Sequence, residues 1–365
     1  MSGRRALHVA AGNLYGGVER ILVEIARAPG GWRHEFAVCF DGRLAHEIDA
    51  SGAERHCLGP ARFSRPWTVW GARRRLRAIC AATAYEAIVC HSPWPYALAS
   101  PVLDEAPVLW AHDAFQGTHW TERRVAGRPP RLIVCNSEYT SSAAHRWLSS
   151  APRTVVYAPV SPPSAAVARR DIRRAFGAAE DLPIIAIASR FERWKGHVPL
   201  LRALAGIEAA CEVWIAGTPQ RPHERDYESQ LRRLARDLRV DGRVRFLTDR
   251  VNVPDLFAAA DIHCQPNTAP EPFGIAFIEA LYAGLPVVTS DAGGPREIVT
   301  ADCGVLLPMG DVDALRRALE ALVCDPAARA RLGAAGPARA WALCEPAARI
   351  AQLEAAIHGA GRTAA

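Results

Sequence analysis

The chain has 365 residues, half of them hydrophobic, and this length and composition favour a globular protein of about two domains. Its ten cysteines are scattered without a C-x-x-C pair, which argues against a disulfide framework or a zinc site and favours a reduced setting. No apolar run reaches the roughly 18 residues of a membrane span, and the first residues lack the apolar core of a signal peptide. We therefore expect a cytoplasmic protein, with peripheral contact at the inner membrane face as an open alternative.

The net charge of +6 is confined to the first half of the chain. Residues 1–165 contain 19 arginines against 13 acidic residues, whereas residues 166–365 contain 25 basic and 25 acidic residues. The densest basic segment, residues 67–79, predicts a helix in which Trp70 and Leu76 alternate with four arginines. Such a helix can lie on an anionic membrane surface, or it can be the solvated face of an ordinary helix. No nucleic-acid-binding motif accompanies the charge, so we expect no nucleic-acid partner.

Taken in chain order, the first half predicts a parallel sheet covered by helices. It begins with a strand at residues 6–10, a turn at 12–17 and a helix at 18–27. Short apolar runs recur at residues 36–40, 87–90, 108–110, 132–135 and 154–157, separated by helical or loop stretches. This alternation is typical of α/β domains.

A second α/β half follows a linker at residues 158–164, where three prolines interrupt the pattern. Strand-like runs then recur at residues 184–188, 212–216, 244–247, 262–265, 286–289 and 304–307. They alternate with amphipathic helices such as residues 227–238, and the alanine-rich region from residue 311 onward predicts helix. The sequence therefore predicts two similar halves, each a sheet with helices.

Lys195 is the only lysine among 44 basic residues. A compact ammonium in an arginine-rich chain suits a point contact with phosphate, and compositional bias alone is the alternative explanation. Arg190 and Lys195 both follow the apolar run 184–188, which predicts a buried strand. Because ligands of open parallel sheets bind at the carboxyl ends of the strands, the sequence predicts an anion site after this strand.

The segment 271–288 contains the strongest signal for a binding site. Pro272 and Gly274 suit a loop that enters a helix, so the amides near Gly274 and Ile275 are expected to be free donors for phosphate at a helix start. Glu279 falls in that helix, where its carboxylate can accept hydrogen bonds from both hydroxyls of a ribose. The alternative is that Glu271 and Glu279 are the acid and the nucleophile of a retaining glycosidase, which needs its carboxyl groups roughly 5 Å apart. A loop and a helix separate the two residues, so a binding role fits better.

Five segments together resemble the retaining glycosyltransferases of group 1, which have the GT-B fold. They are the E-x7-E segment from Glu271 to Glu279, residues 284–288, residues 291–297, Arg190 with Lys195-Gly196, and the turn at Gly16 and Gly17. The resemblance implies an α/β protein with two Rossmann-like domains that face each other across a cleft. It implies an acceptor-binding domain at residues 1–164, a donor-binding domain at 165–340, and a C-terminal helix at 341–365 that packs back toward the first domain.

The resemblance also implies roles for individual residues. Arg190 and Lys195 neutralise the donor diphosphate. The backbone of Gly16 and Gly17 approaches the phosphates closely, because these residues carry no side chain. Glu279 holds the ribose. The remaining contacts to the sugar and the phosphates come from Glu271, Phe273, Gly274 and Ile275.

A histidine that faces the donor sugar is expected after a strand of the first domain. His112, after the predicted strand 108–110, fits by position, and His91 is the alternative. The resemblance implies no metal and no other cofactor, because cationic side chains and helix dipoles accept the charge of the departing diphosphate. Asp311 and Asp313 are spaced like a D-x-D metal motif, but we interpret them as the N-cap and first-turn acid of a helix.

We therefore predict a metal-independent, retaining glycosyltransferase that moves a sugar from a UDP- or GDP-sugar to a glycan, lipid-linked or small-molecule acceptor. No protein nucleophile is required, and the predicted catalytic residues are His112, Glu271, Arg190 and Lys195. Ser189 and Thr248 stand where the family commonly has glycine. The base-binding loop expected at residues 249–250 therefore departs from the family pattern, and the nucleotide preference stays open. The alternatives are a nucleotide-sugar epimerase of the same fold and a nucleotide-sugar-binding protein without catalysis.

Overall fold

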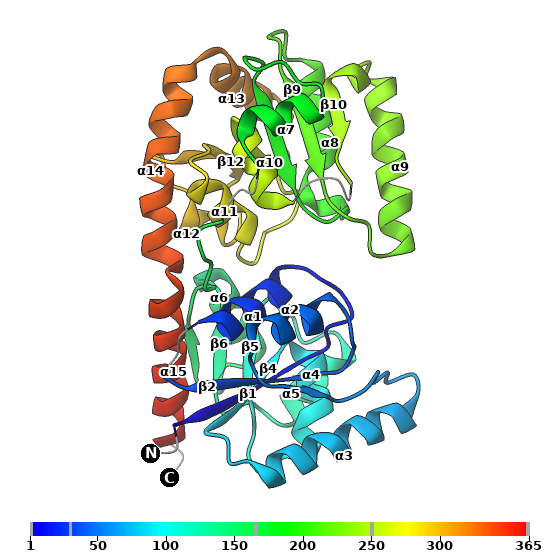
Figure 1. The fold of residues 1–365 in the computed structure, drawn as a ribbon, viewed down its shortest axis with the longest axis vertical. Helices are drawn as coiled ribbons and strands as arrows, with labels where there is room; N and C mark the ends of the chain where they lie inside the picture. Colours follow the sequence, from blue (N-terminus) through cyan, green and yellow to red (C-terminus); the bar gives the residue numbers. More distant parts are fainter. Residues whose placement is uncertain (1–2, 29–30, 164–166, 249–251, 363–365) are drawn as a thin grey trace. The chain divides into compact units, whose positions relative to one another are not determined.

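The structure is a computed structural model that describes residues 3–28, 31–163, 167–248 and 252–362 (Figure 1). The chain divides into two compact units. Unit 1 comprises Met1–Ser161 and Cys344–Ala365, and unit 2 comprises Pro162–Leu343. Each unit contains one parallel β-sheet with helices on both sides.

Unit 1 is built on a seven-stranded sheet with the strand order β3-β2-β1-β4-β5-β6-β7. All of its strand pairs are parallel, and the order reverses between β1 and β4. Ligands of open α/β sheets bind at the carboxyl ends of the strands near such a reversal. The strands are β1 (Arg5–Ala10), β2 (Arg33–Val38), β3 (Arg55–Cys57), β4 (Ala87–His91), β5 (Val108–Ala111), β6 (Ile133–Cys135) and β7 (Arg153–Val155).

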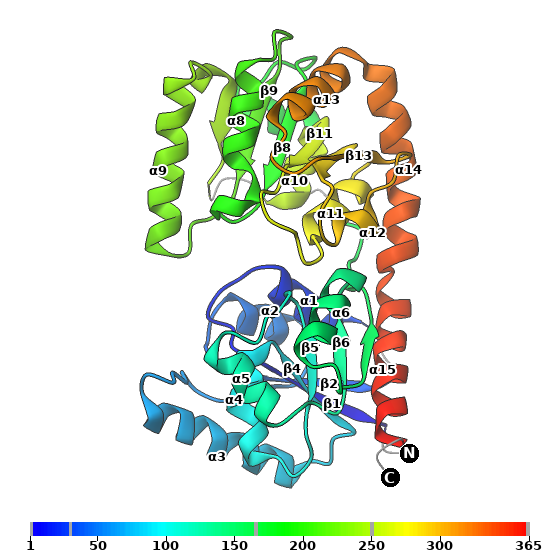
Figure 2. The same cartoon turned by 180° about the vertical axis from the view of Figure 1, so that it is seen from behind.

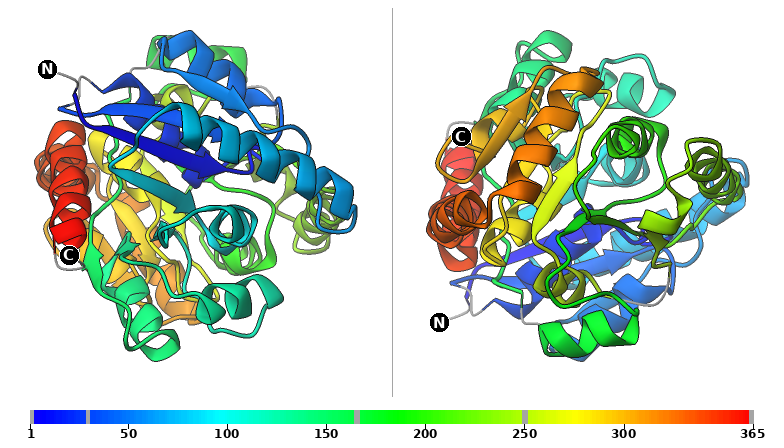
Figure 3. Two further views of the ribbon diagram at one scale, coloured as in Figure 1. Left: turned by 90° about the horizontal axis from the view of Figure 1, so that it is seen from below. Right: turned by 90° about the horizontal axis from the view of Figure 1, so that it is seen from above.

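Alternate residues of β1 face two different helical layers, as the pleat of a strand requires. Leu7 and Val9 belong to a hydrophobic core shared with α3 (Pro66–Ala82), α4 (Pro93–Ala99), α5 (Trp120–Gly127) and α6 (Glu138–Trp147). His8 points to the opposite face, on the side of α15 (Pro346–Arg362). There α1 (Gly17–Arg27) packs on both α15 and α2 (Arg43–Ser51). Figure 3 shows the red helix α15 beside the blue strands of this unit.

Unit 2 is built on a six-stranded parallel sheet with the order β10-β9-β8-β11-β12-β13. Its strands are β8 (Ile184–Ala188), β9 (Glu212–Ala216), β10 (Val244–Phe246), β11 (Ile262–Gln265), β12 (Val287–Ser290) and β13 (Gly304–Leu307). Its α-helices are α7 (Arg169–Ala175), α8 (His197–Ala205), α9 (Pro222–Asp237), α10 (Val253–Ala259), α11 (Ile275–Tyr282), α12 (Pro295–Ile298), α13 (Val312–Cys324) and most of α14 (Pro326–Cys344).

The main hydrophobic core of unit 2 lies on one face of its sheet. Side chains of β8 and β9 pack there against α8, α9 and α13, which Figure 2 shows on the near side. On the other face α10 packs on both α7 and α11. This arrangement leaves the loops after β8, β11 and β12 at one edge of the sheet, because parallel strands all end at the same edge.

The predicted C-terminal helix at 341–365 is interrupted in the structure. Helix α14 ends at Cys344, and α15 begins at Pro346, whose missing N–H costs nothing at a first helical position. The carboxylate of Glu345 accepts hydrogen bonds from the amides of Ala347 and Ala348 at that start. Helix α15 then packs on unit 1, where Gln352 donates a hydrogen bond of 3.0 Å to the carbonyl of Val155.

Most predicted strands are confirmed to within about two residues at their ends. Strand β2 begins at Arg33, three residues before the predicted run 36–40. Strand β3 was not predicted, because its three residues include two polar side chains and form no apolar run. The fold class of two Rossmann-like α/β units is confirmed, and the cleft between them stays a prediction. Among the described helices, none combines the length and apolarity that crossing a bilayer requires.

Candidate functional site

Polar side chains gather at the carboxyl edge of the unit 2 sheet. Arg190 and Lys195 follow β8, and Asn267 and Glu271 follow β11, the strand that pairs with β8. The structure therefore brings together segments that are about 75 residues apart in sequence. We call Lys195, Glu271, Gln265 and Asn267 the carboxylate cluster.

The carboxylate of Glu271 is the centre of this cluster. Its Oε2 atom accepts hydrogen bonds from Nζ of Lys195 at 2.7 Å, from Nδ2 of Asn267 at 3.0 Å and from Nε2 of Gln265 at 3.1 Å. The side chains of Lys195 and Glu271 are only 14% and 9% exposed, so the ion pair is largely withdrawn from water. A buried pair of this kind is costly to break on one side, because the remaining charge is left without compensation.

The backbone around Glu271 is fixed by the neighbouring strand β12 and the loop after it. Ser290 donates a hydrogen bond of 2.7 Å to the carbonyl of Asn267, and the amide of Gly294 donates one of 2.8 Å to the carbonyl of Glu271. Gly293 has a φ of +78°, and a Cβ there would lie 2.2 Å from the carbonyl oxygen of Glu271. Only glycine fits at this close approach, which explains the Gly-Gly pair in the sequence.

Helix α11 begins at Ile275 immediately after the cluster. Gly274 turns the chain with a φ of +106°, and a Cβ there would lie 2.3 Å from the ring of Phe277. The first amides of a helix have no partner within it and lie at the positive end of its dipole. Phe273 and Glu279 are buried, with Glu279 on α11. The loop–helix junction predicted from Pro272 and Gly274 is therefore confirmed.

Lys195 lies in a short 3₁₀ turn that packs against the end of β11. Its ammonium lies 3.9 Å from the centre of the Trp194 ring. Gly196 follows with a φ of +86°, and a Cβ there would lie 2.1 Å from the carbonyl oxygen of Pro266. The amide of Thr268 donates a hydrogen bond of 2.8 Å to the carbonyl of Trp194. These contacts bring the lysine to Glu271. Arg190 is more exposed and forms an ion pair of 2.9 Å with Glu192.

His112 follows β5 at the carboxyl edge of the unit 1 sheet. Its Nε2 atom lies 3.0 Å from Nδ1 of His91, and its ring stacks on that of Trp110. Burial lowers the pKa of His112 to about 3, so its imidazole is neutral near pH 7. The two candidate histidines are thus hydrogen-bonded neighbours, with His112 nearer the edge and His91 fully buried.

Gly16 and Gly17 form the start of α1 in unit 1. Gly16 is the N-cap residue, and its amide donates a hydrogen bond of 2.9 Å to Glu19. Its backbone is extended, and a Cβ there would meet nothing closer than 3.7 Å. Neither the backbone angle nor the packing of the unit requires glycine at this position. The Glu19 carboxylate lies beside this helix start, and contact of Gly16 and Gly17 with a phosphate stays a prediction.

Comparisons with known proteins give these features a context. Residues 168–339 match the sequence family described as "Glycosyl transferases group 1". Residues 168–339 of this chain are therefore a domain of that family. A GDP-mannose-dependent phosphatidylinositol monomannoside mannosyltransferase of Corynebacterium glutamicum is 36% identical over 178 residues, which cover 46% of this chain and 44% of that protein. A D-inositol 3-phosphate glycosyltransferase of Kribbella flavida is 34% identical over 173 residues, covering 45% and 40%.

The chain also resembles solved structures over nearly its whole length. The crystal structure of Anabaena Alr3699/HepE in complex with UDP and glucose aligns with a TM-score of 0.86 at 24% identity, covering 98% of this chain and all of that one. WaaG, a glycosyltransferase involved in lipopolysaccharide biosynthesis, aligns with a TM-score of 0.72 at 16% identity, covering 97% and 100%. These likenesses establish the GT-B fold. The chain matches less than half of the length of the curated relatives.

Two members of the carboxylate cluster, Gln265 and Asn267, were not among the predicted site residues. The signal for them was present, because Gln265 ends a predicted buried strand and Asn267 follows it. The base-binding loop predicted at residues 249–250 lies outside the described residues. Asp311 is confirmed as the N-cap of α13, since its side chain accepts a hydrogen bond from the amide of Ala314.

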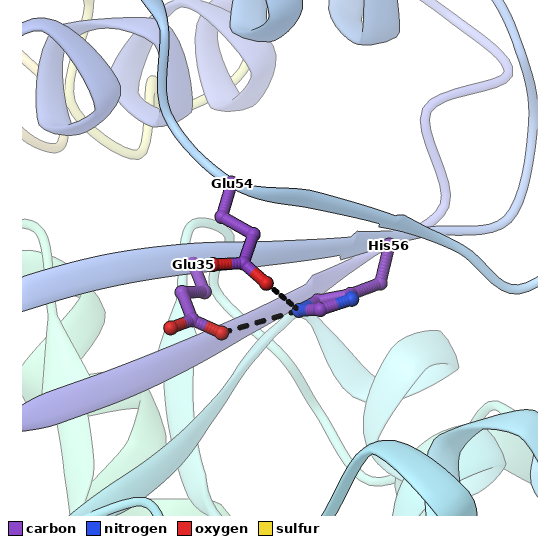
Figure 4. A group of neighbouring side chains, drawn as sticks. All are labelled: Glu35, Glu54 and His56. Atoms are coloured by element: carbon purple, nitrogen blue, oxygen red, sulfur yellow. Dashed lines mark hydrogen bonds and ion pairs between the residues drawn. The ribbon is translucent and has the colours of Figure 1, made fainter. Parts of the chain in front are cut away.

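Glu35, Glu54 and His56 form the one cluster of potential metal ligands found among the described residues (Figure 4). The carboxylate of Glu35 already accepts hydrogen bonds from Tyr85 at 2.6 Å, from His56 at 3.1 Å and from Arg5 at 3.1 Å. These donors keep the pKa of Glu35 low despite its burial. We interpret the cluster as a structural network that links β2 to its neighbouring strands, because the ligand atoms are engaged with one another.

Proposed function

We propose that this protein is a retaining glycosyltransferase that transfers a sugar from a nucleoside-diphosphate sugar to an acceptor hydroxyl. The observation that carries the proposal is the Lys195–Glu271 pair beside the start of α11 in a group 1 glycosyltransferase domain. A largely buried cation, the amides at a helix start and a carboxylate held by amide donors suit a diphosphate next to a sugar rich in hydroxyl groups.

In the proposed reaction, the departing diphosphate is stabilised by groups already in place. Lys195 and Arg190 supply positive charge, and the Gly274–Ile275 amides supply hydrogen-bond donors at the positive end of the α11 dipole. A phosphate oxygen can replace Glu271 as the partner of the Lys195 ammonium. The Glu271 carboxylate then keeps its two amide donors and can accept hydrogen bonds from sugar hydroxyls. The acceptor attacks on the face from which the diphosphate departs, so no protein nucleophile is required.

We propose that the reaction needs no metal, because fixed cationic groups serve the role that a divalent ion would otherwise have. For the donor nucleotide we propose UDP or GDP. A named relative is GDP-mannose-dependent, and a similar solved structure was obtained with UDP and glucose. The named acceptors of the relatives are lipid-linked or small inositol compounds, so we propose a glycan, lipid-linked or small-molecule acceptor.

Helix α3 supports a proposal of peripheral contact with an anionic membrane. Trp67 and Trp70 are 69% and 66% exposed, and the guanidinium of Arg74 lies 5.4 Å from the Trp70 ring. Exposed tryptophans among arginines suit the interface of an anionic bilayer. Flotation with anionic liposomes tests the proposal. Wild type should float at low salt, the Trp67→Ser/Trp70→Ser variant should not, and wild type remaining in the soluble fraction would contradict it.

Calorimetric titration tests the donor site. UDP, GDP and ADP, and then the corresponding sugars, are titrated without added metal into wild type, Lys195→Ala and the control Arg193→Ala. Arg193 is an exposed cation two residues away that contacts Gln230 instead of the cluster. We expect wild type to bind one of the three diphosphates selectively. The affinity for that diphosphate should be largely lost in Lys195→Ala and unchanged in Arg193→Ala.

The outcomes separate the alternatives. Binding by none of the nucleotides would refute the donor site. Conversion of donor alone into an epimer would favour a nucleotide-sugar epimerase. Donor binding without transfer to any supplied acceptor and without slow hydrolysis would favour a binding protein. Product analysis by NMR of the new glycosidic linkage decides whether the anomeric configuration is retained.

A further inference from the structure

Four imidazoles form a continuous hydrogen-bonded row across the sheet of unit 1. Nε2 of His34 lies 3.1 Å from Oε1 of Glu354, and its Nδ1 lies 2.9 Å from Nε2 of His8. Nδ1 of His8 lies 2.9 Å from Nε2 of His91, whose Nδ1 lies 3.0 Å from Nε2 of His112. Every link between rings joins an Nδ1 atom to an Nε2 atom, so the row has a direction.

The register of the parallel strands produces this row. His8 of β1 is paired with Phe36 of β2 and with Val89 of β4. His34 lies two residues before Phe36, and His91 lies two residues after Val89, so all three side chains share a face. His91 is in turn paired with Trp110 of β5, two residues before His112. The row therefore runs diagonally, from the start of β2 beside α15 to the carboxyl end of β5.

Burial keeps the four rings neutral. It lowers the pKa of His8, His34 and His91, and it lowers that of His112 to about 3. A neutral imidazole has one N–H donor and one acceptor nitrogen. Each inner ring must therefore donate at one end and accept at the other.

Glu354 decides which end donates. Its Oε1 atom also accepts a hydrogen bond of 3.1 Å from the amide of Trp32. Because a carboxylate only accepts, Nε2 of His34 must carry the proton, and Nδ1 of His34 accepts from Nε2 of His8. By the same reasoning, Nε2 of His91 donates to Nδ1 of His8, and Nε2 of His112 donates to Nδ1 of His91. The opposite assignment would set the lone pair of His34 against the carboxylate.

We propose that Glu354, His34, His8 and His91 fix His112 as its Nε2–H tautomer, so that its Nδ1 atom is an acceptor for a hydroxyl group of the donor sugar. Among the described residues, the buried Nδ1 atom of His112 has no hydrogen-bond partner. An unprotonated imidazole nitrogen accepts a hydrogen bond from a hydroxyl, whereas an N–H would not. The sugar contact rests on the function proposed above, whereas the tautomer does not. Glu354 and the three inner histidines are positioning residues.

Long-range ¹H–¹⁵N correlation spectra of protein labelled at histidine test the tautomer directly. His112→Gln assigns the His112 signals. We expect wild type to carry its proton on Nε2, and we expect Glu354→Lys to move it to Nδ1, because an ammonium donates where the carboxylate accepted. Ala355→Lys places the same ammonium on the adjacent exposed residue of α15 and should leave the tautomer unchanged. If Glu354→Lys does not fold, Glu354→Gln serves instead and should give a measurable Nδ1–H population.

An Nδ1–H tautomer in wild type, or no change in either Glu354 variant, would overturn the proposal. Calorimetry then tests the sugar contact, with the diphosphate that wild type selects and with its glucose and mannose esters. We expect Glu354→Lys to bind the diphosphate as wild type does and its sugar ester about tenfold more weakly, the loss of roughly one hydrogen bond. Equal weakening of both ligands would overturn the sugar contact. Failure of wild type to bind any diphosphate would refute the function while the spectra still decide the tautomer.

Discussion

Unit 2 should lose stability as the pH falls, because it contains two buried neutral histidines. His263 in β11 is fully buried, and burial lowers its pKa to about 4. His197 at the start of α8 is also fully buried, and burial, reinforced by Lys195, lowers its pKa to about 3. In the unfolded chain both should titrate near the ordinary value of 6.5. Between these values the unfolded state binds more protons than the folded state.

The sign and size follow from this difference in proton binding. The free energy of unfolding falls as the pH drops below about 6.5, at up to about 1.4 kcal/mol per pH unit for each histidine. Between about pH 7.5 and pH 5, each histidine accounts for a loss of about 2 kcal/mol, so the pair accounts for about 4 kcal/mol. The loss attributable to His263 slows near pH 4, where the folded form also becomes protonated.

The assay compares wild type with His263→Met and with the control His223→Gln, which changes an exposed histidine of α9. Urea titrations at several pH values, read by hydrogen exchange of peptides from β8 and β11, report the unfolding of unit 2 itself. His263→Met should be less stable than wild type near pH 7.5, because its hydrogen bond to the carbonyl of Ala186 is lost. Its loss of stability between about pH 7.5 and pH 5 should nevertheless be about 2 kcal/mol smaller than in wild type. A pH dependence identical to that of wild type would refute the reasoning, and His223→Gln should be indistinguishable from wild type.

Three further predictions concern the site and its framework. Lys195→Ala should lower turnover by about 100-fold or more in a transfer assay, through loss of a charge partner of the departing diphosphate, and near-normal turnover would remove Lys195 from the catalytic residues. Gly196→Ala should lower the stability of unit 2 by roughly 2–4 kcal/mol in urea titration, because its Cβ would lie 2.1 Å from the carbonyl oxygen of Pro266; wild-type stability would contradict the geometry. Asp311→Ala should lower the free energy of unfolding by about 1 kcal/mol, because the N-cap of α13 is lost. Asp311→Ser should retain most of this stability, because serine can also cap a helix, and equal losses in the two variants would argue against capping.

Much of the fold was predictable from the sequence because it depends on local pattern. Short apolar runs between amphipathic stretches predicted all the strands except β3, and glycine and proline predicted the loop that enters α11. The position of Lys195 after the predicted strand 184–188 also predicted it as a site residue. These inferences need only the period of a strand or helix and the rule that ligands lie at carboxyl ends. The role of Glu271 was predicted from the segment 271–288 together with the family resemblance.

Only the tertiary structure decided which of these side chains meet. The ion pair of Lys195 with Glu271 depends on β8 lying next to β11, and the row from Glu354 to His112 depends on the order β2-β1-β4-β5 and on its register. Local pattern specifies neither, because any order of similar apolar strands satisfies the same alternation. A single histidine inside the predicted strand 6–10 was visible in the sequence. Its partners come from β2 and β4, and the carboxylate that orients the row comes from α15 near the other end of the chain.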